Sequence, residues 1–312
     1  MSLKSILKKC SPVVWLYAEA QRVYYSLLTV ISPELNTKAR YKERFGKELD
    51  LANPKTLNEK ILWLKLRDYE TNALVRQCAD KYAVRNYVRE MGCEEILVPM
   101  IAAYDSVDEI NWDELPDSFA MKWNFGCGFN IICPNKADLD IPATIKKMKK
   151  WGRTQYHLPY SEMQYKDVPK KIIVEQYLRP KSGILPEDYK IYCFHGKPYC
   201  VMLCADRESG QAKYFFFDRE WNFLRINKAG KEAPEGFTVP KVEGIEAAFQ
   251  YAEKLAEPFP FVRADFYLID GKVYLGELTF TPGGALDSAR LPETDIMFGE
   301  MLNLGHSYGG IS

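Results

Sequence analysis

The chain has 312 residues, of which 47% are hydrophobic and 27% charged, a composition typical of folded globular proteins. Lys plus Arg and Asp plus Glu both number 42, so the net charge is zero and nucleic-acid binding through bulk positive charge is excluded. The 8 cysteines form no C-x-x-C pair and there are only 3 histidines, which argues against a zinc site and predicts reduced thiols in a cytoplasmic protein.

The first part of the chain, residues 1–50, is predicted to form a helical extension. Apolar residues within the segment 5–31 recur at steps of three and four, as they do on one face of a helix. That face consists of Ile6, Cys10, Val13, Tyr17, Ala20, Tyr24, Leu27 and Ile31. Glu19 and Arg22 interrupt the segment too soon for a signal peptide or for a membrane span of roughly 20 apolar residues. Two interpretations remain open: the face packs on the body of the protein, or it lies on the inner face of a membrane, with the lysines of residues 4–9 at its entry.

Helical patterns continue through the first third of the chain. Thr56 and Glu59 form a capping box, which predicts that an amphipathic helix begins at Leu57. A second helix is predicted from residue 72 to residue 91 and contains the segment Asp80-Lys81-Tyr82. Strand-like segments then follow at residues 96–100, 119–123, 131–133 and 172–178.

A strongly β pattern begins at residue 189. Strands are predicted at residues 189–194, 199–205 and 213–217, before a polar loop over residues 227–235. An amphipathic helix follows, with Ile245, Phe249, Ala252 and Leu255 on its apolar side. Two last strands lie within residues 261–280. The whole pattern predicts an α+β fold with a mostly antiparallel sheet in its C-terminal half.

The last two predicted strands carry the most informative charged residues, Arg263, Asp265 and Glu277. Eleven residues separate the two carboxylates, so the turn between the strands decides whether they share a face. A two-residue turn sends Glu277 to the face opposite Asp265. A three-residue turn ending at Gly271 pairs Arg263 with Glu277 and puts both carboxylates, together with Thr279, on one face. That face suits a Mg²⁺–phosphate site, and an exposed Arg–Glu cross-strand pair is the alternative.

Common nucleotide-binding and hydrolase signatures, such as the P-loop, H-E-x-x-H and G-x-S-x-G, are absent from the sequence. Weaker signals fit a phosphate site. Lys122 lies on a predicted strand just before a loop with Gly126 and Gly128, whose backbone N–H groups can bind phosphate. Residues 175–178 end another strand, where a backbone edge can bind adenine. Each of these signals is common in proteins when it stands alone.

In their order along the chain, these segments resemble the ATP-grasp superfamily, in its TupA-like branch associated with surface-polysaccharide and teichuronopeptide synthesis. The resemblance extends from Asn53 to Leu304. The resemblance rests on residues 53–61 (NPKTLNEKI), 80–82 (DKY), 121–124 (MKWN), 175–178 (EQYL), 188–190 (DYK) and 263–284. It implies an ATP-grasp fold, in which a helical N-terminal region precedes two α+β subdomains that grip ATP between antiparallel sheets. The expected segments are 1–50, 51–115, 116–188 and 189–312, the last carrying the metal site.

The resemblance also implies a role for each candidate site residue. ATP is expected to bind at Lys81, Lys122, Asn124, Gly126, Gly128, Glu175, Gln176, Tyr177, Leu178, Glu187 and Asp188, with the two lysines on the α- and β-phosphates. The expected Mg²⁺ ligands are Asp265, Glu277 and Thr279, the last of which stands where many ATP-grasp enzymes have Asn. The expected catalytic cations are Arg263 and Lys190, and the expected substrate contacts are Gly283, Gly284, Ser288 and Arg290.

ATP-grasp ligases join a carboxylate to an amine through an acyl phosphate, so the resemblance implies an ATP- and Mg²⁺-dependent ligase. The expected substrates are an amine such as an amino acid, and a uronic acid or similar sugar carboxylate, either small or lipid-linked, in polysaccharide biosynthesis. Three alternatives remain: a glycosyltransferase, for which Asp138-Leu139-Asp140 is a candidate D-x-D motif, an ATP-dependent sugar kinase, and a non-catalytic nucleotide-binding partner.

Overall fold

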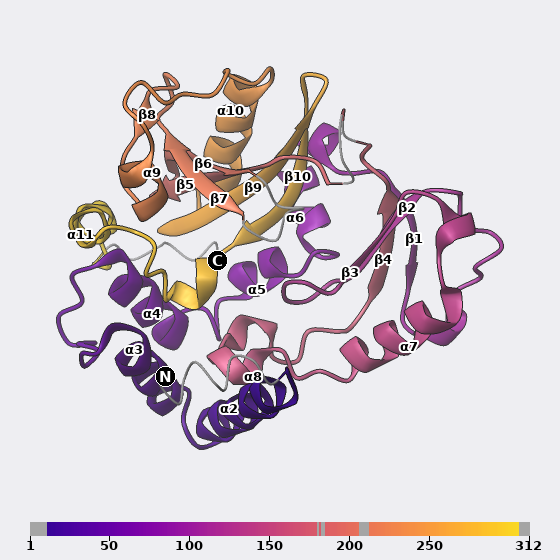
Figure 1. Cartoon of the computed structure of the whole chain (residues 1–312), viewed down its shortest axis with the longest axis horizontal. Helices are drawn as coiled ribbons and strands as arrows, with labels where there is room; N and C mark the ends of the chain where they lie inside the picture. Colours follow the sequence, from indigo (N-terminus) through magenta and orange to yellow (C-terminus); the bar gives the residue numbers. More distant parts are fainter. Residues whose placement is uncertain (1–10, 180, 182–184, 206–211, 306–312) are drawn as a thin grey trace.

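The computed structural model describes residues 11–179, 181, 185–205 and 212–305 (Figure 1). The α-helices are α2 (Ser11–Ile31), α3 (Pro33–Phe45), α4 (Leu57–Arg67), α5 (Ala73–Ala79), α6 (Val84–Glu90), α7 (Ile141–Gly152), α8 (His157–Tyr160), α9 (Lys228–Glu232), α10 (Ile245–Ala256) and α11 (Pro292–Met301). The strands are β1 (Met100–Tyr104), β2 (Phe119–Trp123), β3 (Asn130–Cys133), β4 (Ile172–Gln176), β5 (Asp188–Phe194), β6 (Lys197–Ala205), β7 (Lys213–Phe217), β8 (Phe223–Leu224), β9 (Phe261–Ile269) and β10 (Lys272–Thr279).

The smaller of the two sheets has four strands in the order β1-β4-β2-β3, and every neighbouring pair is antiparallel. Phe119, Met121 and Trp123 of β2 are buried in a core that Met148 of α7 completes. Because successive side chains of a strand point to opposite faces, Lys122 points away from this core, into a cavity between the two sheets.

The larger sheet has six strands in the order β10-β9-β5-β6-β7-β8 and is also antiparallel throughout. α10 packs on it with the predicted apolar side, since Phe249, Ala252 and Leu255 are buried. The buried hydrophobic residues of α4, α5 and α6 belong to the same core. The antiparallel sheet predicted for the C-terminal half is therefore confirmed, and the helices of the first third cover it.

α4 begins where its sequence predicts. The Thr56 side chain accepts a hydrogen bond from the Glu59 amide, and the Glu59 carboxylate accepts one from the Thr56 amide at 3.0 Å, which completes the capping box. Tyr41 of α3 donates to the same carboxylate at 2.7 Å. The capping residue of α4 thus also anchors the N-terminal helical extension.

The single helix predicted from residue 72 to residue 91 is wrong, because α5 and α6 are separate helices. Asp80, between them, accepts hydrogen bonds from the amides of Tyr82 at 2.7 Å and Ala83 at 3.2 Å, which compete with the helical pattern. The Lys81 amide donates instead to the carbonyl of Asn124 at 2.8 Å. This break joins Lys81 to the smaller sheet and lets its side chain reach the cavity.

Two smaller predictions are also wrong. The strand predicted at residues 96–100 begins only at Met100, because Pro99 has no backbone N–H to donate to a strand ladder. The loop predicted over residues 227–235 contains the short helix α9, whose first turn is capped by the Asn227 side chain accepting from the Gly230 amide at 2.9 Å.

α2 packs on the body with the face opposite to its predicted apolar face. Tyr25 and Thr29, which are 6% and 4% exposed, lie on the packed side against α3 and α8. On the predicted face, the described residues Tyr17, Ala20, Tyr24, Leu27 and Ile31 are exposed. The interpretation that this face packs on the protein is therefore wrong, since hydrogen bonds hold the packed side instead. Ile6, Cys10 and the lysines of residues 4–9 lie outside the described residues, and no described helix is long and apolar enough to cross a membrane.

Candidate active site

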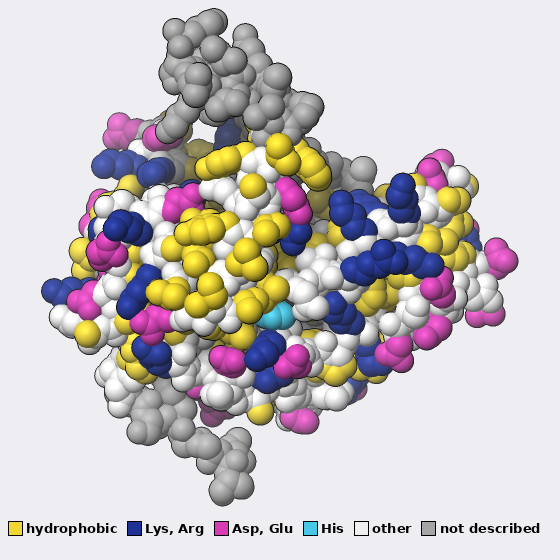
Figure 2. Space-filling model, turned by 90° about the horizontal axis from the view of Figure 1, so that it is seen from below, with side chains coloured by type: hydrophobic (Ala, Val, Ile, Leu, Met, Phe, Trp, Pro, Cys, Tyr) yellow, Lys and Arg dark blue, Asp and Glu magenta, His cyan; other side chains and the backbone are white. Residues whose placement is uncertain are grey.

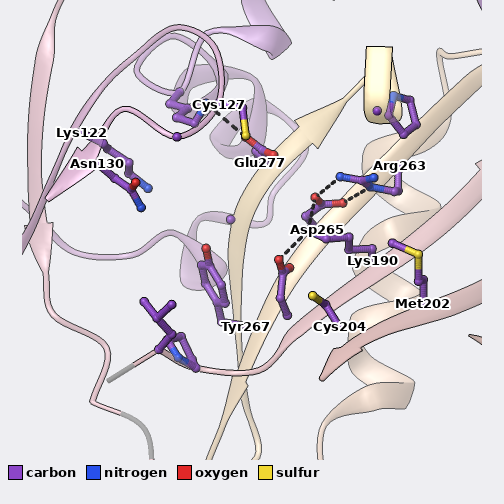
Figure 3. Close-up of a pocket in the computed structure, with 18 of the residues that line it drawn as sticks. Lys122, Cys127, Asn130, Lys190, Met202, Cys204, Arg263, Asp265, Tyr267 and Glu277 are labelled. Carbon is purple, nitrogen blue, oxygen red and sulfur yellow. Dashed lines mark hydrogen bonds and ion pairs between the residues drawn. The ribbon is translucent and has the colours of Figure 1, made fainter. Parts of the chain in front are cut away.

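A cavity of about 620 Å³ lies between the two sheets (Figure 3). β2, β4 and the loop after β2 line it on one side, and β5, β6, β9 and β10 on the other. The expected site residues that line it are Lys81, Lys122, Gly126, Gly128, Glu175, Gln176, Tyr177, Leu178, Asp188, Lys190, Arg263, Asp265, Glu277 and Gly283. Most of the expected ATP-binding residues and two of the expected metal ligands thus share one cavity.

The turn between β9 and β10 has two residues, Asp270 and Gly271, with φ values of 50° and 74°. Positive φ at both positions is the geometry of the tight turn that joins two antiparallel strands. The three-residue turn considered from the sequence is therefore wrong. Taken alone, the two-residue turn would send Glu277 to the face opposite Asp265.

A β-bulge at Gly276 restores the common face. The register of the β9–β10 ladder shifts between Leu275 and Glu277, so Glu277 pairs directly with Asp265, and Thr279 pairs with Arg263. The four polar side chains 263, 265, 277 and 279 then lie on one face, as the sequence predicts. The extra residue stands in the strand rather than in the turn.

Asp265 is the centre of a buried charge cluster (Figure 3). Arg263 donates to both of its oxygens, Nε to Oδ1 at 2.7 Å and Nη2 to Oδ2 at 2.6 Å. Lys190, which pairs with Asp265 in the β5–β9 ladder, has its Nζ 2.7 Å from Asp265 Oδ2 and 2.5 Å from Asp188 Oδ2. Burial by itself lowers the pKa of Lys190 and of Arg263, but the nearby carboxylates, Asp265 foremost, raise both pKa values above the ordinary range. Both side chains therefore stay charged.

Glu277 joins this cluster to the loop after β2. Its Oε2 lies 3.1 Å from Nζ of Lys81, which also donates to the Gly126 carbonyl. Burial raises the pKa of Glu277, but the charges of Lys81, Lys190 and Arg263 outweigh burial and lower that pKa to about 2. Gly126 has φ 67°, and a Cβ there would lie 2.5 Å from the Tyr156 ring. The loop therefore requires glycine at this position.

Lys122 is held by a buried carboxylate on the neighbouring strand. Its Nζ lies 2.7 Å from Oε2 of Glu175, whose Oε1 lies 3.2 Å from Nη1 of Arg85. Arg85 also donates to the Val98 carbonyl at 3.0 Å. Glu175, expected from the resemblance as part of the adenine-binding edge, thus uses its side chain to position a lysine of the cavity.

The face of Asp265 and Glu277 carries the oxygen donors that Mg²⁺ prefers. Thr279 Oγ1 lies 3.3 Å from Glu277 Oε1 and 3.5 Å from Asp265 Oδ2, although Thr279 itself does not line the cavity. Within the described part of the chain, no group of three or more His, Cys, Asp or Glu side chains is placed to hold a metal ion. A Mg²⁺ site completed by phosphate oxygens needs only one or two carboxylates, so this donor set fits an ion that arrives with a nucleotide.

Five expected ATP-binding or substrate residues do not line the cavity, and three of them, Asn124, Glu187 and Arg290, use their side chains elsewhere. Asn124 is fully buried, donates to the Pro169 carbonyl at 2.9 Å and accepts from the Lys171 amide at 2.9 Å. Its side chain therefore holds the loop after β2 in place without lining the cavity. Glu187 accepts a hydrogen bond from the Tyr189 hydroxyl and lines a separate cavity of about 310 Å³. Arg290 is buried with Nη1 2.6 Å from Asp295 Oδ1, so an existing ion pair occupies its guanidinium.

The remaining substrate candidates follow β10 in a turn. Gly283 lines the cavity with φ 59°. The Gly284 amide donates to the Thr281 carbonyl at 2.8 Å, so this N–H is used within the turn. Ser288 is half-buried and does not line the cavity. Among these candidates, Gly283 is the one that the fold brings to the site.

The candidate D-x-D motif of a glycosyltransferase does not reach either cavity. Asp138 accepts a hydrogen bond from the Asn135 side chain at 2.8 Å, and Asp140 caps α7 by accepting from the Ala143 amide at 2.9 Å. Both carboxylates therefore serve local capping roles, which argues against a metal site here.

Several lining residues were not identified from the sequence. Tyr267 follows Arg263 and Asp265 at the next alternate position of β9, so strand periodicity would have found it. Met202 and Cys204 line the cavity from β6, opposite Lys190 and Asp188 in the ladder. Arg44 of α3 also lines it and donates to the Leu286 carbonyl at 3.2 Å. No local pattern marks Arg44, because only the packing of the N-terminal extension brings it there.

Comparisons with known proteins place these observations in context. A family model described as TupA-like ATPgrasp matches residues 59–303. The chain is similar to D-alanine–D-alanine ligase from Bacillus anthracis complexed with ATP, at 15% identity and a TM-score of 0.44, over 72% of this chain and 65% of that chain. It is also similar to L-amino acid ligase from Bacillus licheniformis, at 12% identity and a TM-score of 0.41, over 70% of this chain and 44% of that chain. The chain thus spans less than two thirds of either structure, and similarities at this level carry no conclusion about its chemistry. The search of curated proteins gives no match.

Proposed function

The chain belongs to the TupA-like ATP-grasp family and has the ATP-grasp fold, and from this premise we propose that it is an ATP- and Mg²⁺-dependent carboxylate–amine ligase. One observation carries the proposal. Asp265 and Glu277 pair directly on one face of the β9–β10 hairpin, and the cations Lys81, Lys190 and Arg263 surround them in a cavity between two sheets.

In this proposal the nucleotide lies between the two sheets. Lys81 and Lys122 bind its α- and β-phosphates, and the turn of Gly126 and Gly128 offers backbone N–H groups to the phosphates. The backbone of residues 175–178 binds the adenine, and Asp188 lies near the ribose. In the described structure both lysines are paired with carboxylates, so charged partners already hold them in the cavity before a phosphate arrives.

The proposed reaction has two steps. A carboxylate oxygen of the acid attacks the γ-phosphorus of ATP, ADP leaves, and the acyl phosphate that forms is attacked at its carbonyl carbon by the amine. Phosphate then leaves, the nitrogen loses a proton, and an amide results. Arg263 and Lys190 stabilise the charge of the transferring phosphoryl group. Asp265 and Glu277, with Thr279 beside them, would hold Mg²⁺, which neutralises phosphate charge when bound.

The proposed substrates are a uronic acid or similar sugar carboxylate and an amino acid, joined in the cytoplasm during surface-polysaccharide synthesis. This substrate class is the one implied by the resemblance of the sequence motifs to the TupA-like branch, the branch whose family model matches the chain. Gly283 lines the cavity, and its amide is the proposed donor to an acyl-phosphate oxygen. No protein nucleophile is needed, because the work of the site is to position the reactants and to exclude water.

The test is ADP release from Mg²⁺-ATP with a panel of uronic acids and amino acids, each alone and in pairs. The ligase predicts release that needs both an acid and an amine. Asp265→Asn and Glu277→Gln are each expected to reduce this release by about a hundredfold or more, because each removes a negative charge that the proposed site uses to hold Mg²⁺. Asp270→Asn is the matched control. It makes the same change at the exposed tip of the same hairpin, where Asn tolerates the positive φ.

The outcomes separate the alternatives. Release with a sugar alone would indicate a kinase, and binding of a nucleotide-sugar in preference to ATP would indicate a glycosyltransferase. ATP bound without release under every pairing would indicate a non-catalytic partner. Full activity of both carboxylate variants would overturn the proposed metal site.

A further inference from the structure

The outward surface of α2 is apolar from Leu16 to Ile31. Figure 2 views the molecule from the side on which α2, α8 and α7 lie in Figure 1, and hydrophobic side chains gather in the middle of this face. The exposed apolar side chains of α2 include Leu16, Tyr17, Val23, Tyr24, Leu27, Val30 and Ile31, with exposed fractions of 47% to 72%. At 100° per residue they fall within one arc of the helix, and this arc contains no charged residue.

The inward surface of the same helix is polar. The Tyr25 hydroxyl donates to Glu43 Oε2 at 2.6 Å, and the Gln21 side chain donates to Glu43 Oε1 at 2.9 Å. The Thr29 hydroxyl lies 2.8 Å from that of Ser161 and 2.5 Å from the Leu158 carbonyl. A surface helix in water normally buries its apolar face and exposes its polar face. α2 has the reverse arrangement, so its outward face is built to contact something less polar than water.

A row of basic side chains lies beside this apolar face. Lys146, Lys147, Lys150 and Arg153, at the C-terminal end of α7, are exposed, and Figure 2 shows basic side chains gathered next to the hydrophobic area. The pKa of Glu19 on α2 is lowered mainly by its hydrogen bond from Arg22 and further by the charge of Lys150, so this lysine of the row lies close to α2. Because the whole chain has a net charge of zero, this row is a local concentration of positive charge.

We propose that α2 binds the protein to the surface of an anionic lipid bilayer. Its outward apolar face lies in the headgroup–acyl boundary, and the α7 lysines contact the lipid headgroups. A helix lying in the interface combines an apolar face with flanking basic residues, as this surface does. Trp15, Tyr17 and Tyr24 are exposed on α2, and aromatic rings with a polar end favour that boundary. This inference does not rest on the proposed ligase activity.

The test is flotation of the full-length protein with vesicles of phosphatidylglycerol and phosphatidylcholine, beside vesicles of phosphatidylcholine alone. The wild-type protein is expected to float with the anionic vesicles and to bind the neutral ones at least about tenfold more weakly, with binding reduced by added salt. The variant Leu16→Glu/Leu27→Glu is expected to lose flotation, because it places two charges in the apolar arc. Both side chains are exposed, so the fold should tolerate the change, and circular dichroism verifies this.

Two further variants make the result specific. Lys146→Glu/Lys150→Glu is expected to weaken binding to anionic vesicles by about tenfold or more while leaving binding to neutral vesicles unchanged. Ile296→Glu, at an apolar residue of α11 that is 48% exposed, is the matched control and should float as the wild type does.

The proposal is overturned if the folded wild-type protein stays with the soluble fraction, or if Leu16→Glu/Leu27→Glu floats unchanged. The proposal is equally overturned if the outward face of α2 instead packs on a second copy of the chain. In that case the wild type would form dimers in sedimentation without binding vesicles, and the α2 variant would be monomeric. ADP release measured without vesicles should be the same in the α2 variant and the wild type, so a failure here is distinct from a failure of the ligase proposal.

Discussion

Glu277 lies directly across the β9–β10 ladder from Asp265, and the single extra residue at Gly276 makes this possible. Without the bulge, the two-residue turn would place the two carboxylates on opposite faces of the hairpin. The bulge also brings the backbone close: a Cβ at position 276 would lie 3.1 Å from the Asp265 carbonyl oxygen and 3.2 Å from the Tyr267 ring. The position of both proposed Mg²⁺ ligands therefore depends on a residue with no side chain.

Gly276→Ala tests this dependence. The methyl group needs a shift of a few tenths of an ångström between the strands, which displaces Glu277 relative to Asp265. We expect ADP release to fall by about tenfold while the free energy of unfolding falls by only about 1 kcal/mol. The measurements are steady-state ADP release over a range of Mg²⁺ concentrations and urea unfolding. An unchanged Mg²⁺ requirement and rate would show that the spacing of the two carboxylates is not critical.

Cys127 is expected to report on nucleotide binding. It lies in the loop between Gly126 and Gly128, lines the cavity and is exposed, whereas the other described cysteines are buried. Desolvation and the charge of Glu277 raise the pKa of its thiol, so alkylation should be slow at neutral pH and faster as the pH rises. Bound Mg²⁺-ATP is expected to slow alkylation of this thiol, as followed by mass spectrometry in a Cys10→Ser background. Equal rates with and without ATP would contradict the placement of the phosphates at this loop.

Glu175 forms ion pairs with Arg85 and Lys122 at a site that is largely shielded from solvent. The exposed fractions of the Glu175, Arg85 and Lys122 side chains are 6%, 8% and 17%. Glu175→Gln leaves both positive charges without their carboxylate, so we expect a loss of about 2 to 4 kcal/mol in the free energy of unfolding and a weaker affinity for ATP.

The control for Glu175 is an ion pair on the surface. Asp105→Asn removes the partner of Lys171, and the Asp105 side chain is 71% exposed. It should leave the free energy of unfolding close to that of the wild type, because water screens such a pair. Urea unfolding and calorimetric titration with ATP measure both effects. A Glu175→Gln protein as stable as the Asp105→Asn protein would contradict the role assigned to the buried carboxylate.

Glu59 makes the stability of the protein dependent on acid pH. Burial raises its pKa, but the amides of Thr56 and Lys55, the Tyr41 hydroxyl and the charge of Lys47 outweigh burial and lower the pKa below its ordinary value of 4.5. A folded-state pKa below the unfolded value means that the stabilisation is complete above pH 4.5 and is lost as the pH falls through the folded value.

We therefore expect Glu59→Gln to be less stable than the wild type by about 1 kcal/mol at pH 7, with the difference shrinking below pH 4.5. Urea unfolding at a series of pH values measures this. Glu48→Gln, at a side chain that is 73% exposed, should follow the wild type at every pH. A difference between Glu59→Gln and wild type that stays constant with pH would show that the carboxylate charge does not contribute.

Arg44 is expected to act on the acid substrate rather than on ATP. It reaches the cavity near Gly283 and Leu286, at the end proposed for the acyl phosphate. Arg44→Gln should raise the KM for the acid by about tenfold and leave the KM for ATP unchanged, because a charge-assisted contact to a carboxylate is lost. Lys42→Gln, at a position of α3 that does not line the cavity, is the matched control. An increase in the KM for ATP alone would place Arg44 with the nucleotide.

Elements whose signals are local could be predicted from the amino-acid sequence. The capping box at Thr56 and Glu59, the apolar side of α10 and the strand at residues 119–123 are all predicted correctly, because each depends on neighbours a few residues away. The order of short motifs along the chain was also sufficient to identify the TupA-like ATP-grasp family, which the family model matches over residues 59–303.

How these elements face one another depends on contacts between segments that are distant in the sequence. The break between α5 and α6 depends partly on a hydrogen bond from Lys81 to Asn124, which lies far along the chain. The bulge at Gly276 sets the register of β9 and β10, and no sequence pattern shows which residue of a strand will be left without a partner in the pairing. α2 turns its polar side inward because Glu43 and Ser161 offer partners there. In each case the free energy of a contact between distant segments outweighed the local preference, and a single sequence does not reveal which segments meet.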